Sequence, residues 1–171
     1  MSKELQEALN QQVTNELYAA HLYLSMAAYF ESLNLPGFAN FMKVQHREEL
    51  SHAMKIFDFI NDRNGRVYLQ AIKQPPVEFQ SVQEVMEKAL EHEKHVTEVI
   101  YKLYEMAQRQ KDYAAHVLME WFVEEQVEEE KLFTELLEHV KLVGNDGTGL
   151  LMLDARLAQR KDEEEGEEAE S

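Results

Sequence analysis

The sequence predicts an all-α protein: a four-helix bundle with a long crossover at its middle and a short fifth helix near its end. Apolar residues recur at spacings of three and four along four long segments, which is the pattern of amphipathic helices. The 171 residues include only three prolines and six glycines, so long helices can run uninterrupted. The middle of the chain has no such stripe, which indicates a connection between helices.

The first two predicted helices form a hairpin. The first covers residues 2–33 and ends at a turn signal, the Asn-Leu-Pro-Gly stretch of residues 34–37. The second covers residues 38–64. Gly65 follows it and is a natural C-cap residue, because glycine accepts the left-handed backbone that often ends a helix.

A crossover of residues 66–80 separates this hairpin from the next helix. It contains Pro75-Pro76 and is long for a connection inside a compact domain, so we interpret it as joining two parallel helices at opposite ends of a bundle. Ser81 is a good N-cap, and Glu84 completes a capping box. The third helix is expected to run from there to Gln108.

The fourth helix is predicted from a cap at Asp112 to Val143, and the glycine-rich stretch after it breaks the pattern. A shorter fifth helix over residues 148–159 carries several leucines. We expect these five helices to form one domain over residues 1–160. Residues 161–171 are almost all acidic from residue 162 on and are predicted to be a disordered tail.

The composition excludes several classes of function. A net charge of −16 argues against nucleic acid as a partner and favours cations. Cysteine is absent, which excludes disulfides, thiolate zinc sites, cysteine nucleophiles and Cys-ligated iron–sulfur clusters. No segment looks like a signal peptide or a bilayer span, so we expect a cytoplasmic protein without a membrane partner.

Polar side chains interrupt all four apolar stripes at one level. The offset from Glu16 to Glu49 equals that from Glu93 to Gln126, and Glu16 and His52 are as far apart as Glu93 and Glu129. The two hairpins therefore place their polar residues at matching heights. Because a crossover relates the halves by a pseudo-twofold axis, six side chains can converge at the bundle centre: Glu16, Glu49, His52, Glu93, Gln126 and Glu129.

Such a cluster needs positive charge. An ionised carboxylate in an apolar core costs several kcal/mol or more, and no Lys or Arg falls on the stripes beside these acids. Either the acids are neutral or cations share the site. Two divalent metals would balance four carboxylates, and oxygen ligands with one imidazole suit iron or manganese, while zinc also fits. Glu49 and His52 are one turn apart, and Glu49 is well placed to bridge two ions.

The chain resembles the bacterial and archaeal non-haem ferritins over residues 5–159. The motifs that carry this resemblance are specific when taken together. They are Asn15-Glu16-Leu17-Tyr18, Tyr23-Leu24-Ser25-Met26-Ala27, Glu48-Glu49-Leu50-Ser51-His52-Ala53, Gly65-Arg66-Val67, Pro75-Pro76 and the run from Trp121 to Glu130. The resemblance implies the ferritin-like fold, with two irons per subunit held at a ferroxidase centre.

Site residues follow from the matching positions. The resemblance implies that Glu16, Glu49 and His52 bind the first iron, that Glu49, Glu93 and Glu129 bind the second, and that Gln126 helps hold ligands or oxygen species. A third iron site is implied at Glu48, Glu125 and Glu128, with Glu129 shared. Tyr23 is either a donor of an electron or a hydrogen bond to a ligand, or a core tyrosine with a satisfied hydroxyl.

Two departures from related families limit the cofactors. Bacterioferritins have a second Glu-x-x-His, where this chain has Gln126-Val127-Glu128-Glu129, and they bind haem through a methionine at the position of Leu50. We therefore expect no haem. Rubrerythrins carry a cysteine-ligated iron domain, which a chain without cysteine cannot form.

The resemblance implies an iron-storage protein that oxidises Fe(II) with O2 or H2O2 and deposits ferric oxyhydroxide inside a 24-subunit cage. The leucines of the fifth helix need a surface to bury against beyond the four-helix core, which agrees with contacts between subunits. Two alternatives stay open from the residues. One is a di-iron oxidase or peroxidase without mineral storage, and the other is a structural bundle whose buried acids bind nothing.

Overall fold

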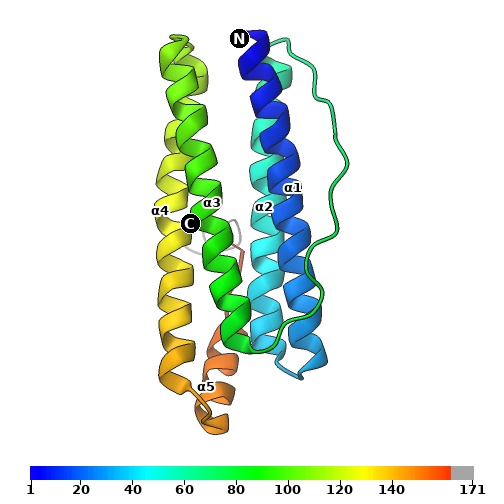
Figure 1. Ribbon diagram of the computed structural model, residues 1–171, viewed down its shortest axis with the longest axis vertical. Helices are drawn as coiled ribbons and strands as arrows, with labels where there is room; N and C mark the ends of the chain where they lie inside the picture. The colour runs from blue at the N-terminus through cyan, green and yellow to red at the C-terminus, as the bar shows by residue number, and fades with distance from the viewer. Residues whose placement is uncertain (163–171) are drawn as a thin grey trace, which may run out of the picture.

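The computed structural model describes residues 1–162, in which α-helices are the only regular secondary structure. Four long helices run side by side and a short one closes one end (Figure 1). The helices are α1 (Lys3–Ser32), α2 (Pro36–Asp62), α3 (Val82–Arg109), α4 (Tyr113–Val143) and α5 (Gly147–Leu157). The all-α prediction is confirmed. The predicted disordered tail lies, from residue 163 on, outside the described residues.

The crossover runs the length of the bundle beside α1, from the end of α2 to the start of α3, so α2 and α3 are parallel (Figure 1). The predicted cap of α3 is present, since Ser81 Oγ accepts the N–H of Glu84 at 3.0 Å. Asp112 caps α4 in the same way by accepting the N–H of Ala115 at 3.2 Å. Within residues 1–162, no helix is long and apolar enough to cross a membrane.

The end of α2 differs from the prediction. The helix ends at Asp62, and Asn64, with φ of 55°, takes the left-handed conformation that we expected at Gly65. Gly65 is needed for a different reason. A Cβ at this position would lie 2.7 Å from Oε1 of Gln6 and 2.8 Å from Ile60, so only glycine fits against these neighbours.

Helix α5 packs on the start of α2. A Cβ on Gly37 would overlap the backbone of Asp154, and the carboxylate of Asp154 accepts the N–H of Phe38 at 2.9 Å. Leu153 and Leu157 are buried in the same core as the long helices. The expectation that all the leucines of this helix lie outside a complete four-helix core was therefore wrong for these two. Leu151 remains 63% exposed and Met152 remains 71% exposed.

The hydrophobic core is split into two clusters by a layer of polar side chains. On α1, Leu9 and Val13 belong to one cluster and Tyr23 to the other, and Glu16 falls between them. The same change of cluster occurs on α2, α3 and α4 at their polar residues. The buried polar residues of this layer are Glu16, Gln45, Glu49, His52, Glu93, Gln126 and Glu129.

Candidate metal centre

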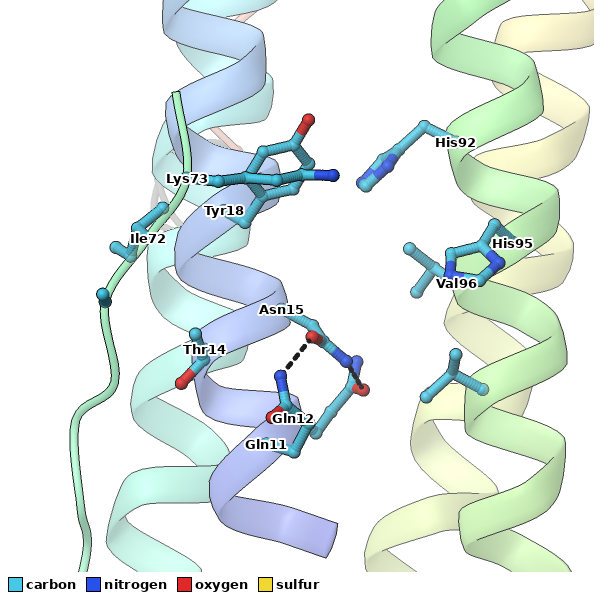
Figure 2. A pocket seen from close by; sticks show the side chains of 12 residues that line it. Gln11, Gln12, Thr14, Asn15, Tyr18, Ile72, Lys73, His92, His95 and Val96 are labelled. Atoms are coloured by element: carbon cyan, nitrogen blue, oxygen red, sulfur yellow. Dashed lines mark hydrogen bonds between the residues drawn. The ribbon is translucent and has the colours of Figure 1, made fainter. Parts of the chain in front are cut away.

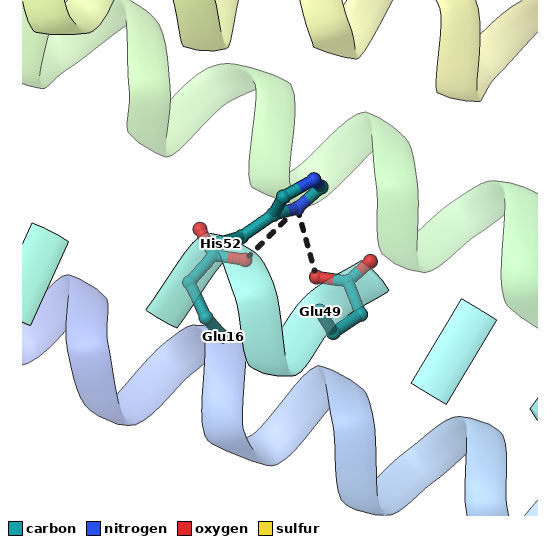
Figure 3. A group of neighbouring side chains, drawn as sticks. All are labelled: Glu16, Glu49 and His52. Carbon is teal, nitrogen blue, oxygen red and sulfur yellow. Dashed lines mark ion pairs between the residues drawn. The ribbon is translucent and has the colours of Figure 1, made fainter. Parts of the chain in front are cut away.

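Three side chains of the polar layer meet around one point. Glu16 comes from α1, and Glu49 and His52 come from successive turns of α2, with ligand atoms within 4.8 Å of one another (Figure 3). Nδ1 of His52 is 3.5 Å from Oε2 of Glu49 and 4.0 Å from Oε2 of Glu16. Two carboxylates and one imidazole at these separations can share a metal ion.

Neighbouring side chains hold these three in place. The amide of Gln12, one turn before Glu16, donates to Oε1 of Glu16 at 2.6 Å. The His52 ring packs in T-shaped contacts against Trp121 and Phe122, with centroid distances of 5.4 and 5.9 Å. Buried aromatic packing on one side and a hydrogen bond on the other reduce the freedom of the ligand atoms.

The other hairpin contributes Glu93, Gln126 and Glu129, and each is buried. Glu93 accepts hydrogen bonds from the Tyr23 hydroxyl and from Nε2 of Gln126, the latter at 3.1 Å. Glu129 accepts from Nε2 of Gln45 at 2.9 Å. These two acids stand outside the compact group of three, and each is held by its own donors. We refer to Glu16, Glu49, His52, Glu93 and Glu129 as the central cluster.

Burial sets the charge of the central acids. Desolvation raises the pKa of Glu93 to about 7 and that of Glu129 to about 8, and the negative charge of Glu93 adds to the shift of Glu129. Desolvation also holds the pKa of Glu49 well above its usual range, although His52 partly offsets it. Without a metal, these acids therefore retain protons well above the pH at which exposed glutamates ionise.

The negative charges of the surrounding acids raise the pKa values of His52 and Tyr23. Burial alone would lower the pKa of His52, but close contacts with Glu125 and Glu49 and the charge of Glu16 raise it to about 12. The imidazolium is thus the positive charge of the metal-free layer. Burial, with the charges of Glu93, Glu49 and Glu129, raises the pKa of Tyr23 well above its usual range, so the phenol keeps its proton and donates a hydrogen bond to Glu93.

The predicted third-site residues lie on the outside of the layer, between α2 and α4. Glu48 and Glu125 are half-buried and Glu128 is exposed, around a cavity of about 440 Å3. Arg160, just after α5, reaches into it, and its Nη2 atom is 2.8 Å from Oε2 of Glu48. We refer to Glu48, Glu125, Glu128 and Arg160 as the face cluster. Nε2 of His52 is 3.6 Å from Oε1 of Glu125, so the two clusters touch.

A family model described as a ferritin-like domain matches residues 6–143. This chain belongs to the ferritin family. The match covers all four long helices except the first residues of α1, and therefore every residue of the central cluster. The resemblance predicted from the motifs is confirmed. Membership assigns the chain to a family of iron-binding, iron-storage proteins.

Two bacterial non-heme ferritins are similar to this ferritin over almost all of its length. The one from Staphylococcus epidermidis is 43% identical over 160 residues, which cover 94% of this chain and 96% of that protein. The one from Staphylococcus aureus is 39% identical over 165 residues, covering 96% and 99%. An open-pore ferritin from the hyperthermophilic archaeon Archaeoglobus fulgidus has a similar structure, with a TM-score of 0.93 and 48% identity over 94% of this chain and 99% of that one.

Gln12, Gln45, Thr97 and Arg160 form hydrogen bonds with the predicted site residues of this ferritin but were not predicted to be part of the site. Gln12 and Thr97 are four residues from Glu16 and Glu93, and this i,i+4 spacing on a helix could have revealed them. Arg160 has no such signal, because its position depends on how α5 packs.

Proposed function

We propose that this ferritin oxidises Fe(II) at the central cluster and stores the ferric product as an oxyhydroxide mineral. Glu16, Glu49 and His52 would bind one iron, and Glu49, Glu93 and Glu129 the other, with Glu49 shared. Iron is the substrate and supplies the electrons, which O2 or H2O2 accepts. Anionic oxygen ligands favour Fe(III) over Fe(II), so this donor set promotes the oxidation.

The observation that carries this proposal is the balance of charge in the polar layer. Glu16, Glu49, Glu93 and Glu129 are all at most 4% exposed, and within residues 1–162 none forms an ion pair with a Lys or Arg. Four buried acids with one histidine are unfavourable unless protons or metal ions neutralise them. Two divalent cations neutralise four carboxylates and release the protons that the metal-free layer holds.

The surrounding residues have positioning roles. Gln126 donates to Glu93 and is 3.3 Å from the hydroxyl of Thr97, and Thr97 Oγ1 donates to Glu130 at 2.6 Å. This series of hydrogen bonds fixes one carboxylate oxygen of Glu93, and the other oxygen lies beside Tyr23. The hydrogen bond from the Tyr23 hydroxyl to Glu93 supports a role in orienting Glu93 or in supplying an electron.

A cage of 24 subunits would provide the storage cavity. Leu151 and Met152 of α5 remain exposed and would bury against neighbouring subunits. The face cluster would hold a third iron through Glu48, Glu125 and Glu128, with Glu129 shared.

The relatives' names describe non-heme ferritins, which supports a protein without haem. We place the protein in the cytoplasm without a nucleic-acid or membrane partner, in line with its charge of −16.

The iron retained per chain tests storage. Apo-protein would be loaded with excess Fe(II) in air, desalted and assayed for iron. Retention of far more than roughly three irons, the number that the central and face sites could hold, supports mineral storage in a cavity. Retention of only about that number favours a di-iron oxidase or peroxidase without storage. Retention of none contradicts the assignment of the central cluster as an iron site.

A further inference from the structure

A separate cavity lies on the opposite side of the polar layer from the face cluster, between α1, the crossover and α3. Its volume is about 410 Å3, which suits a small ligand. Tyr18, Lys73, His92 and His95 line part of it, and polar side chains of α1 together with apolar side chains of the crossover and α3 line the rest (Figure 2). None of the proposed iron ligands lines this cavity.

The lining is positively charged in a strongly acidic protein. The chain carries a net charge of −16, yet none of the residues that line this cavity is Asp or Glu. Lys73 forms no ion pair with a carboxylate of residues 1–162. Its side chain extends over the Tyr18 ring, with Nζ 5.1 Å from the ring centroid, and points toward His92 across the cavity (Figure 2).

His92 has an unused polar atom here. Its Nε2 atom is shielded from solvent and has no hydrogen-bond partner among the described residues. The ring packs on Tyr18 at a centroid distance of 5.9 Å and faces the ammonium group of Lys73 (Figure 2). Buried polar atoms are almost always satisfied, so an unpaired one beside a cavity indicates a missing partner. His95, one turn further along α3, lines the same cavity.

We propose that this cavity binds a phosphate group, either inorganic phosphate or the end of a phosphomonoester. The ammonium of Lys73 supplies the positive charge. His95 and the Tyr18 hydroxyl supply N–H and O–H donors from two helices, a turn of the His92 ring toward the cavity would add another, and the phosphate oxygens accept them. A metal cation fits less well, because Lys73 would repel it and the lining offers it no carboxylate.

The phosphate site adjoins the metal centre. Gln12 lines the cavity and also donates to Glu16 at 2.6 Å. The His92 ring packs edge-on against Tyr23 at a centroid distance of 6.1 Å, and Tyr23 donates to Glu93. A bound phosphate would therefore be one side chain away from Glu16, through Gln12, and two side chains away from Glu93, through His92 and Tyr23. Only this link rests on the proposed function; the phosphate site itself does not.

Equilibrium dialysis with radiolabelled inorganic phosphate tests the proposal. The full-length protein would first be stripped of metal with a chelator, and the dialysis run at an ionic strength of about 0.15 M, which screens the overall negative charge. We expect saturable binding at a single site per chain. Lys73→Gln should weaken it about tenfold or more, because it removes a charged donor. Lys94→Ala removes an equal charge from an exposed position of α3 outside the cavity, and binding should be unchanged.

A second variant and a competitor make the result decisive. His92→Phe keeps an aromatic ring for packing and removes the N–H donor, so it should also weaken binding, and a melting curve checks that it folds. Phenyl phosphate that displaces the label more tightly than unlabelled phosphate would identify a phosphomonoester as the ligand, and the reverse order would identify the free ion. The absence of saturable binding, or equal affinity in the wild type and Lys73→Gln, would overturn the proposal. Because no iron is present, neither outcome depends on ferroxidase activity.

Discussion

The central cluster and the face cluster are both rich in glutamate, and Glu48 and Glu49 are neighbours in the chain, yet the two clusters balance their charge differently. Glu49 is buried among other acids, and its pKa is raised chiefly by desolvation. Glu48 is half-buried and pairs with Arg160 at 2.8 Å. The guanidinium of Arg160 also donates to Gln45, which in turn donates to Glu129.

We infer from this difference that the position of a residue on the helix decides how far its charge depends on metal. A turn of about 100° per residue places Glu49 inside the bundle and Glu48 at its edge. Among the inner acids the His52 imidazolium supplies one positive charge, and the remaining negative charge is neutralised by protons or by metal ions. At the edge, an arginine of the same chain already supplies positive charge. We therefore expect perturbations of the central cluster to depend strongly on metal, and those of the face cluster to have smaller effects.

The largest effect is expected from Glu49→Ala, because Glu49 is the ligand that we propose both irons share. The initial rate of Fe(II) oxidation, followed by absorbance in a stopped-flow instrument, should fall roughly 100-fold, at the upper end of the loss caused by removing groups that support metal sites. Glu48→Ala is the matched control on the adjacent residue, and its initial rate should change only severalfold. Equal losses in both variants would remove the distinction between the two clusters.

Metal should stabilise the folded protein through the central cluster. A metal that binds only the folded state at about 100 times its dissociation constant adds about 2.7 kcal/mol to the free energy of unfolding. For a chain of this size, such a gain raises Tm by roughly 5–10 °C. Calorimetry of metal-free and Zn(II)-loaded protein measures the shift.

Glu16→Ala should remove most of this gain, and Lys131→Ala, at an exposed position beside the face cluster, should retain it. Coincident melting curves with and without metal would instead support the alternative in which the bundle is structural and its acids bind nothing.

The stability of the metal-free protein should fall as the pH rises from about 5 to about 8. Glu93 and Glu129 have folded pKa values of about 7 and about 8, above the ordinary value, so the folded state holds more protons than the unfolded state in this window. Rising pH then favours unfolding, by about 1.4 kcal/mol per pH unit for each extra proton held. His52, with a pKa of about 12, acts in the same direction above neutral pH.

Measurements of Tm against pH test this expectation. Glu93→Gln keeps the shape of the side chain without its titration, so its slope should be shallower than that of the wild type. A metal-free protein that becomes more stable between pH 5 and 8 would show that the central acids are ionised without metal.

The sequence predicted the parts of this site that depend on helix geometry. Four stripes with matching offsets are enough to place Glu16, Glu49, His52, Glu93, Gln126 and Glu129 in one layer, because a straight helix converts spacing into height. It did not predict Arg160 or the burial of Leu153. Both depend on how α5 folds back onto α2, where Gly37 allows Asp154 to approach. Such long-range packing leaves no periodic pattern in the chain.

The smallest effect is expected from Arg160→Ala, which removes the cation of the face cluster. The Arg160–Glu48 pair is partly exposed, so we expect a loss of roughly 1 kcal/mol or less in metal-free protein. Binding of a trivalent probe such as Tb(III) to the face cluster, read from its luminescence after the central cluster is filled with Zn(II), should become severalfold tighter, because the substitution removes the positive charge of Arg160 from beside Glu48.

Lys161→Ala is the control, since Lys161 lines the same cavity but is exposed and its ammonium is in no ion pair within residues 1–162. It should change the Tb(III) affinity less than Arg160→Ala does. If the two variants behave alike, the general charge around the cavity sets the affinity. If only Arg160→Ala binds the probe more tightly, Arg160 occupies the position of a cation in the face cluster and iron must displace it there, whereas in the central cluster iron displaces protons.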